Sequence, residues 1–167
     1  MAAELDFDEL FDLRRRAHRR MPGGERMVRF RWAAQDGAIW LLPAALVGQQ
    51  GLVTRAHETQ WNTGPIEQPK LFGFWLAMAA RQDIWRALRG VPGLMPVVRA
   101  TPDPENQSVS VLVGAVVPQA RANHAIDAVL SDIFQPRRIN AWTDWALSKA
   151  KAHASGERAQ LGTTVGA

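Results

Sequence analysis

The segment VRFRWAAQDGAIWLL, residues 28–42, decides the fold class. Its large apolar side chains alternate on either side of Asp36-Gly37, a dipeptide typical of the two-residue turn between antiparallel strands. A turn at these residues places Trp32 opposite Leu41, so the facing of both strands follows from the turn. The predicted hairpin has a core face of Val28, Phe30, Trp32, Ile39 and Leu41. Its opposite face carries Arg29, Arg31, Ala33, Trp40 and Leu42.

The rest of the chain predicts further strands and helices. Apolar patterns predict a third strand at 52–57 and a second hairpin at 97–101 and 108–117, with Val109, Val111 and Val113 on its more buried face. Helical spacing predicts helices at 6–21, at 70–89, from Pro118 to a break at Gln135-Pro136, and at 138–153. A helical turn is expected at 43–48 and a surface loop at 58–69. This order favours an α+β fold, an antiparallel sheet built from two hairpins and covered on one face by about four helices.

Length and C-terminal composition predict one domain followed by a tail. A chain of 167 residues has the ordinary size of a domain, and no repeat or linker divides it. After Ser155 the only large apolar residues are Leu161 and Val165, too few to offset the entropy of ordering. We therefore expect a single α+β domain at residues 1–154 and a flexible tail at residues 155–167.

Composition limits the chemistry and the location of the protein. The chain has no cysteine, which excludes disulfides, thiolate nucleophiles and thiolate metal sites. Its first residues lack the features of a secretory signal, and the longest apolar run, residues 71–80, is too short to span a bilayer. A cytoplasmic protein without a membrane partner is expected. The 17 arginines against 3 lysines, with abundant alanine, favour a bacterial source with a GC-rich genome.

Residues with catalytic potential are few. No zinc-binding helix, phosphate-binding loop or serine nucleophile elbow occurs, and no residue set predicts a metal or another cofactor. His57 beside Glu58 is the pair best suited to acid–base chemistry. The alternative, a polar strand end that leads into a loop, is favoured. No catalytic residue is therefore assigned, and a small enzyme around His57 is the third functional hypothesis.

Arginine interleaved with tryptophan is the pattern that bears most directly on function. Arginine binds phosphate through two parallel hydrogen bonds, and an exposed tryptophan can stack on an unpaired base. The alternative is that a helix covers the arginine face of the first hairpin and that the other arginines complement a helix dipole. Under the first interpretation the nucleic-acid-binding residues are Arg15, Arg16, Arg19, Arg20, Arg29, Arg31, Trp40, Arg137 and Arg138.

Two non-catalytic functions remain after this search. The first is an accessory protein that binds nucleic acid or a nucleoprotein assembly through arginine-rich surfaces. The second is a protein–protein adaptor, chaperone or assembly factor, which would bind a partner or a second copy of itself through an apolar patch that contains Trp40, Trp75, Trp85 or Trp145. A formal charge of +4 permits a nucleic-acid partner without requiring one. A continuous arginine surface would favour the first function, and a continuous apolar patch the second.

Overall fold

The computed structural model describes the backbone of residues 1–45 and 51–165, and the side chains of these residues up to 156. Six strands form one antiparallel sheet in the order β1-β4-β6-β5-β3-β2. The strands are β1 (Ala2–Ala3), β2 (Phe30–Gln35), β3 (Ala38–Pro43), β4 (Leu52–Asn62), β5 (Met95–Asp103) and β6 (Ser108–Pro118). The predicted α+β fold with two hairpins in one sheet is therefore confirmed. Of the helical turn expected at 43–48, residue 43 belongs to β3, and residues 46–48 lie outside the described residues.

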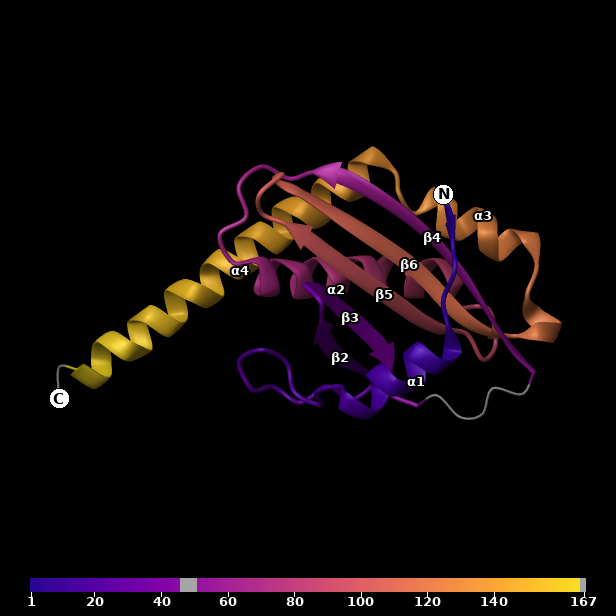
Figure 1. Ribbon diagram of the computed structural model, residues 1–167, viewed down its shortest axis with the longest axis horizontal. Helices are drawn as coiled ribbons and strands as arrows, with labels where there is room; N and C mark the ends of the chain where they lie inside the picture. Colours follow the sequence, from indigo (N-terminus) through magenta and orange to yellow (C-terminus); the bar gives the residue numbers. More distant parts are fainter. Residues whose placement is uncertain (46–50, 166–167) are drawn as a thin grey trace.

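Helices cover both faces of this sheet. They are α1 (Phe7–Arg16), α2 (Pro69–Leu88), α3 (His124–Asp132) and α4 (Pro136–Val165), with a short 3-10 helix, η1, at Gln119–Arg121. In Figure 1, α2 and α4 lie behind the sheet and α1 lies in front of it. The prediction that the helices share one face is therefore wrong for α1. Its Leu10 and Leu13 are buried against the second face of the sheet, which is also apolar.

The first hairpin, β2–β3, forms in the predicted register. Trp32 pairs with Leu41, and the turn residues Asp36 and Gly37 have φ angles of 52° and 78°. Positive φ at both central residues gives the turn whose twist matches that of two antiparallel strands. The side chain of Trp32 is 5% exposed, and its ring lies edge-on to Phe74 of α2, with 5.7 Å between centroids. The hairpin is thus anchored in the core between the sheet and α2.

The opposite face of the same hairpin forms a second core under α1. Trp40 is only 3% exposed and belongs to a buried cluster with Leu42, Leu10 and Leu13. The expectation that Trp40 is exposed for base stacking is therefore wrong, because α1 covers it. Val28 departs from the prediction in the other direction: it lies in a bend before β2 and is exposed instead of core-facing.

The second hairpin, β5–β6, lies in the middle of the sheet and is buried on both faces. Val111 and Val113 face the core under α2, while Leu112 and Val116 face the core under α1. The prediction that one face of this hairpin is less buried is wrong, because helices pack on both sides of it. Figure 1 shows these two strands between β4 and β3.

Helix α1 and strand β4 do not end where the sequence predicted. Helix α1 ends at Arg16, because Ala17 is extended and begins a loop. Strand β4 continues to Asn62 through the segment predicted as a loop, and Trp61 lies on it. The Nε1 of Trp61 donates a hydrogen bond to Oγ1 of Thr143 at 2.9 Å, which joins this strand to α4.

Helix α4 is longer than predicted. It continues to Val165, so the predicted boundary between domain and tail falls inside a helix. Ala150 of α4 is buried, and the ring of His153 lies close to Gly23 in the loop after α1. Among the described residues, none of the helices has both the length and the apolar character needed to cross a membrane.

Candidate nucleic-acid interface

The loop between α1 and β2, residues 17–29, folds back along the edge of the sheet. Backbone hydrogen bonds connect His18 and Trp32 in both directions, at 2.6 and 3.3 Å. Arg20 and Arg26 face each other across the same loop, which reverses at Pro22-Gly23-Gly24 with positive φ at both glycines. The loop therefore gathers arginines from three consecutive segments, the end of α1, the loop itself and the edge strand β2.

A first group of arginines surrounds Arg31, which lies on β2 near the end of α1. Two backbone carbonyls, those of Met27 and Phe30, accept hydrogen bonds from Nη1 of Arg31. Its Nε is buried and has no acceptor among the described residues. Burial and three neighbouring positive charges hold the pKa of Arg31 below its usual value; these charges belong to Arg14, Arg19 and Arg26. Positive charge is thus concentrated here, and the ion pairs between described side chains do not include these arginines.

A second group is the pair Arg29 and Arg81, where β2 begins beside α2. The guanidinium of Arg81 lies over the ring of Phe30, 4.3 Å from its centroid. Burial, and then the charge of Arg29, lower the pKa of Arg81 from its usual value. Arg29 lies in the bend that leads into β2 and is only two residues before Arg31, so the two groups are neighbours along the chain.

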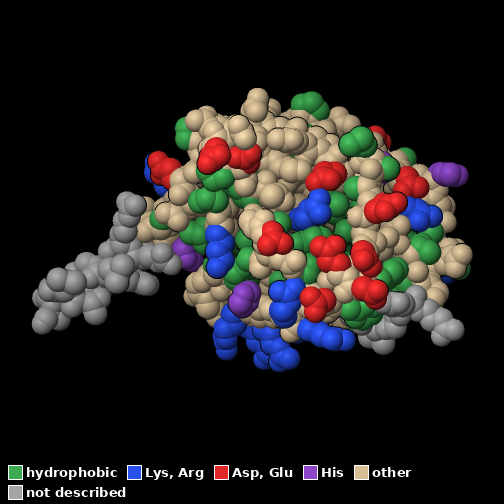
Figure 2. Space-filling model, in the orientation of Figure 1, with side chains coloured by type: hydrophobic (Ala, Val, Ile, Leu, Met, Phe, Trp, Pro, Cys, Tyr) green, Lys and Arg blue, Asp and Glu red, His purple; other side chains and the backbone are tan. Residues whose placement is uncertain are grey.

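The arginines of these two groups are together called the arginine edge: Arg14, Arg19, Arg26, Arg29, Arg31 and Arg81. The described side chains form ion pairs at Arg16–Asp12, Arg55–Asp127, Arg86–Asp83 and Arg99–Glu58. No residue of the arginine edge takes part in these pairs. Figure 2 shows cationic side chains gathered along the lower edge of this view, while acidic side chains occupy the middle of the same face. An external anion would therefore meet several arginines that have no carboxylate partner within the described structure.

The structure divides the predicted binding residues into those at this surface and those elsewhere. Arg19, Arg29 and Arg31 belong to the arginine edge, and Arg15 and Arg20 are exposed on the adjoining helix end and loop. Arg19 comes near Arg31 because α1 ends early and the chain turns back along β2.

The other predicted residues do not share that surface as free cations. Arg16 is paired with Asp12 at 3.0 Å and also donates to Gln35 at 2.8 Å. Arg137 and Arg138 lie at the start of α4, at the top of Figure 1, whereas the loop after α1 lies at the bottom. The two arginines there line a shallow depression that also contains a carboxylate, that of Asp83.

The possible acid–base pair His57–Glu58 is divided by the sheet. Successive strand residues point to opposite faces, and Oε1 of Glu58 accepts hydrogen bonds from Arg99 at 2.7 Å and Ser110 at 2.9 Å on the α1 side. His57 points toward the other face, where its Nδ1 is buried without a described partner. Within the described part of the chain, no three His, Asp or Glu side chains are grouped so as to hold a metal ion.

Four residues of the interface are not among the predicted binding residues: Arg14, Arg26, Arg81 and Trp85. Arg26 lies in a segment that contains no periodic pattern, and Arg81 and Trp85 lie within a helix where apolar residues are the dominant signal. Trp85 is 41% exposed, and the sequence suggested it only for an apolar protein-binding patch. The one available signal was the spacing of Arg81 and Trp85, which puts them four residues apart on one helix face.

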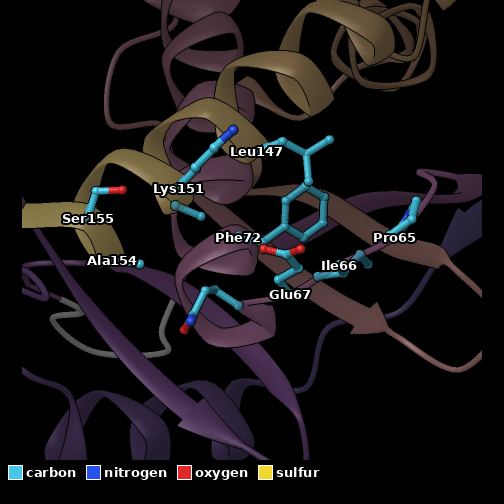
Figure 3. A pocket seen from close by; sticks show the side chains of 10 residues that line it. Pro65, Ile66, Glu67, Phe72, Leu147, Lys151, Ala154 and Ser155 are labelled. Atoms are coloured by element: carbon cyan, nitrogen blue, oxygen red, sulfur yellow. The ribbon is translucent and has the colours of Figure 1, made fainter. Parts of the chain in front are cut away.

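Other hollows on the protein are less suited to an anion. The cavity in Figure 3, about 340 Å³, lies between the start of α2 and the far part of α4 and includes Phe72, Lys151 and Glu67. The carboxylate of Glu67 points toward Phe72 in that view, which places negative charge in the cavity. The charges of Lys151 and Glu67 offset each other there, whereas the arginine edge has no corresponding carboxylate among the described residues.

Comparison with known proteins does not assign the chain to a family. No protein-family model matches it, and neither a curated protein nor a solved structure matches it.

Proposed function

We propose that the protein binds nucleic acid through the arginine edge. The observation that carries this proposal is the concentration of arginines along β2 and the adjoining loop, where no arginine of the edge has a carboxylate partner within the described structure. Burial and neighbouring arginines lower the pKa of Arg31 and of Arg81. Like charges held together oppose folding unless an anion reduces their repulsion. The backbone of a nucleic-acid strand supplies such anions at regular intervals.

The chemistry of the side chains favours phosphate. All six cations of the surface are arginines, whose planar guanidinium groups match the oxygens of a phosphate through paired hydrogen bonds. Arg14 is held in place because its guanidinium donates to the carbonyl of Ala44, and Arg81 is held over Phe30. Cations that are positioned before binding lose less side-chain entropy when a ligand arrives.

The place of the arginines in the sheet also supports binding. β2 is an edge strand, and among the described residues the loop backbone pairs with it only at Trp32, through His18. Positive charge along a sheet edge is a known protection against pairing with another strand, but the edge is also open to a long ligand. A chain of phosphates can follow this edge from the end of α1 to the start of β2.

Charge reversal tests the proposal. The double variant Arg19→Glu/Arg26→Glu changes two exposed side chains of the arginine edge, and we expect it to weaken binding of a fluorescent single-stranded oligonucleotide at least about 10-fold at low salt. The matched control is Arg137→Glu/Arg138→Glu, which has the same change in net charge at the start of α4. Fluorescence anisotropy measures both. Equal losses in the two variants would show that binding depends on net charge and not on this surface.

A protein partner is the second candidate function, favoured by one observation on the helical side. Trp145 of α4 is 39% exposed and lies edge-on to Trp75 of α2, with 5.6 Å between ring centroids. Beside it is a hollow of about 310 Å³ that includes Ala79 and Ala141. Exposed aromatic rings of this kind are enriched at protein interfaces. If the wild-type protein binds no oligonucleotide at micromolar concentration, this surface becomes the favoured functional site.

A further inference from the structure

A small pocket lies at the end of the arginine edge, between the start of β2, α2 and the segment that leads into β5. Its volume is about 220 Å³. The pocket is lined by Arg29, Arg81 and Trp85 and by the apolar residues Pro43, Leu94 and Met95. Pockets for complete drug-sized ligands are typically larger, so this one has room for about one ring system.

The wall of the pocket combines an aromatic surface with two cations. Trp85 is 41% exposed, and Arg81 is four residues before it on α2, so both lie on the same side of the helix. Arg81 in turn rests on Phe30, which fixes the plane of its guanidinium. A flat ligand can therefore stack on Trp85 while an attached anion reaches Arg81 and Arg29.

The two cations have no carboxylate partner among the described residues. The four ion pairs formed by described side chains involve neither Arg29 nor Arg81. Partial burial and the nearby charge of Arg29 lower the pKa of Arg81, and a bound anion would reverse the effect of that charge. Arginine nevertheless stays protonated in proteins, so the pocket retains its positive charge.

We infer that this pocket holds one unpaired base of a bound single strand, stacked on Trp85, with the adjoining phosphate on Arg29 and Arg81. The inference rests on the proposed function and makes it more specific, because only an unpaired base has a free face for stacking. It also gives the interface the aromatic residue that buried Trp40 does not provide. The protein then prefers single strands to duplexes.

An acidic peptide with an aromatic side chain is the nearest alternative ligand. The nucleic acid is favoured because Arg29 of the pocket is only two residues before Arg31, around which the other arginines of the edge gather, so further phosphates of the same strand can bind there. An acidic peptide has no aromatic ring next to each charge. Poly-glutamate serves as the probe for this alternative.

The test compares a short fluorescent oligothymidylate with an abasic oligonucleotide of the same length and phosphate number. We expect the wild-type protein to bind the oligothymidylate roughly 5- to 100-fold more tightly, the range of a single stacking interaction. Trp85→Leu should bring this ratio close to one. Trp145→Leu is the matched control. Trp145 is similarly exposed, at 39%, but it lies on α4 and does not line this pocket, so the variant should retain the ratio.

Each outcome of this test has a separate meaning. Equal binding of both probes by the wild-type protein overturns the base pocket and leaves the proposed nucleic-acid function standing. Competition by poly-glutamate as strong as that by oligothymidylate overturns the base pocket in favour of an acidic ligand. Failure of both oligonucleotides to bind at micromolar protein overturns the proposed function itself. The ratio for the wild-type protein needs no substitution, so the inference stays testable even if Trp85→Leu does not fold.

Discussion

The two hairpins of the sheet differ in whether the charge of their arginine is balanced by a carboxylate. In the central hairpin β5–β6, Arg99 lies over the ring of Trp40, and its charge is balanced by Glu58 at 2.7 Å. In the edge hairpin β2–β3, Arg31 donates to backbone carbonyls, keeps one buried Nε without a described acceptor, and is surrounded by other arginines. The charge of Arg99 is balanced within the described residues, and the charge of Arg31 has no described counter-charge.

This difference shows where the fold leaves charge available. The central pair Arg99–Glu58 is 27% and 34% exposed, so water compensates each charge only in part and each gains from the opposite charge. At an edge, water and dissolved ions can compensate a cation, and the fold tolerates it. Uncompensated charge at an edge is therefore free to take part in binding, whereas Arg99 contributes to the structure of the domain.

The comparison requires that the edge hairpin is anchored as firmly as the central one. Trp32→Ala removes a ring that is 5% exposed and whose Nε1 donates to the carbonyl of Arg20 at 2.6 Å. We expect the free energy of unfolding to fall by about 3–5 kcal/mol, as for other buried aromatic residues. Urea denaturation measures the loss. A loss below about 1 kcal/mol would mean that the edge hairpin contributes little to the core.

The contribution of the Arg99–Glu58 pair to stability can be tested by substitution of Glu58. Glu58→Gln leaves Arg99 without its counter-charge and weakens the hydrogen bond from Ser110. The side chains of Arg99 and Glu58 are 27% and 34% exposed, and this access to water limits the expected loss of unfolding free energy to about 1–2 kcal/mol.

The control for this variant is Asp12→Asn. Its partner Arg16 is 54% exposed and Asp12 itself 64%, so the same urea experiment should show a loss below about 0.5 kcal/mol. If the two variants lost equal stability, the central pair would be no better shielded than a surface pair, and the contrast between the hairpins would fail.

At the arginine edge, removal of a charge should raise the free energy of unfolding instead of lowering it. Arg26→Gln removes one of the charges that repel Arg31, and we expect the free energy of unfolding to rise by about 0.3–0.5 kcal/mol at low salt. High salt screens the repulsion, so the gain should disappear there. Arg86→Gln is the control, because Arg86 lies beside Asp83 at 3.6 Å and its removal brings no gain. A loss of stability in Arg26→Gln would contradict the idea of uncompensated charge.

The sequence contains enough information for the fold because local patterns determine most of it. The Asp36-Gly37 turn fixes the register of the first hairpin, and helical spacing locates α2 within a residue at each end. Which face of the hairpin is covered could not be predicted, because it depends on where α1 docks. Trp40 and Arg31 point to the same side of the sheet, and only the position of α1 buries the first while leaving the second at its margin.

The candidate site could be predicted only in part. Clusters of consecutive arginines are visible in the sequence, and the structure places Arg19 near Arg31 and Arg29 near Arg81. Arg81 and Trp85 reach it from a helix more than forty positions later, a contact of tertiary structure that no local pattern contains. Arg137 and Arg138 resemble the other pairs in sequence, yet the fold places them elsewhere.

The salt dependence of binding tests the central claim most directly. A fluorescent single-stranded oligonucleotide is titrated with the wild-type protein at several salt concentrations, and the logarithm of the association constant is plotted against that of the salt concentration. Each phosphate neutralised on a single strand contributes about −0.7 to the slope, so contacts from three to six arginines predict a slope of about −2 to −4. A slope near zero, or no binding at micromolar protein in low salt, would contradict the account of the arginine edge as a phosphate-binding surface.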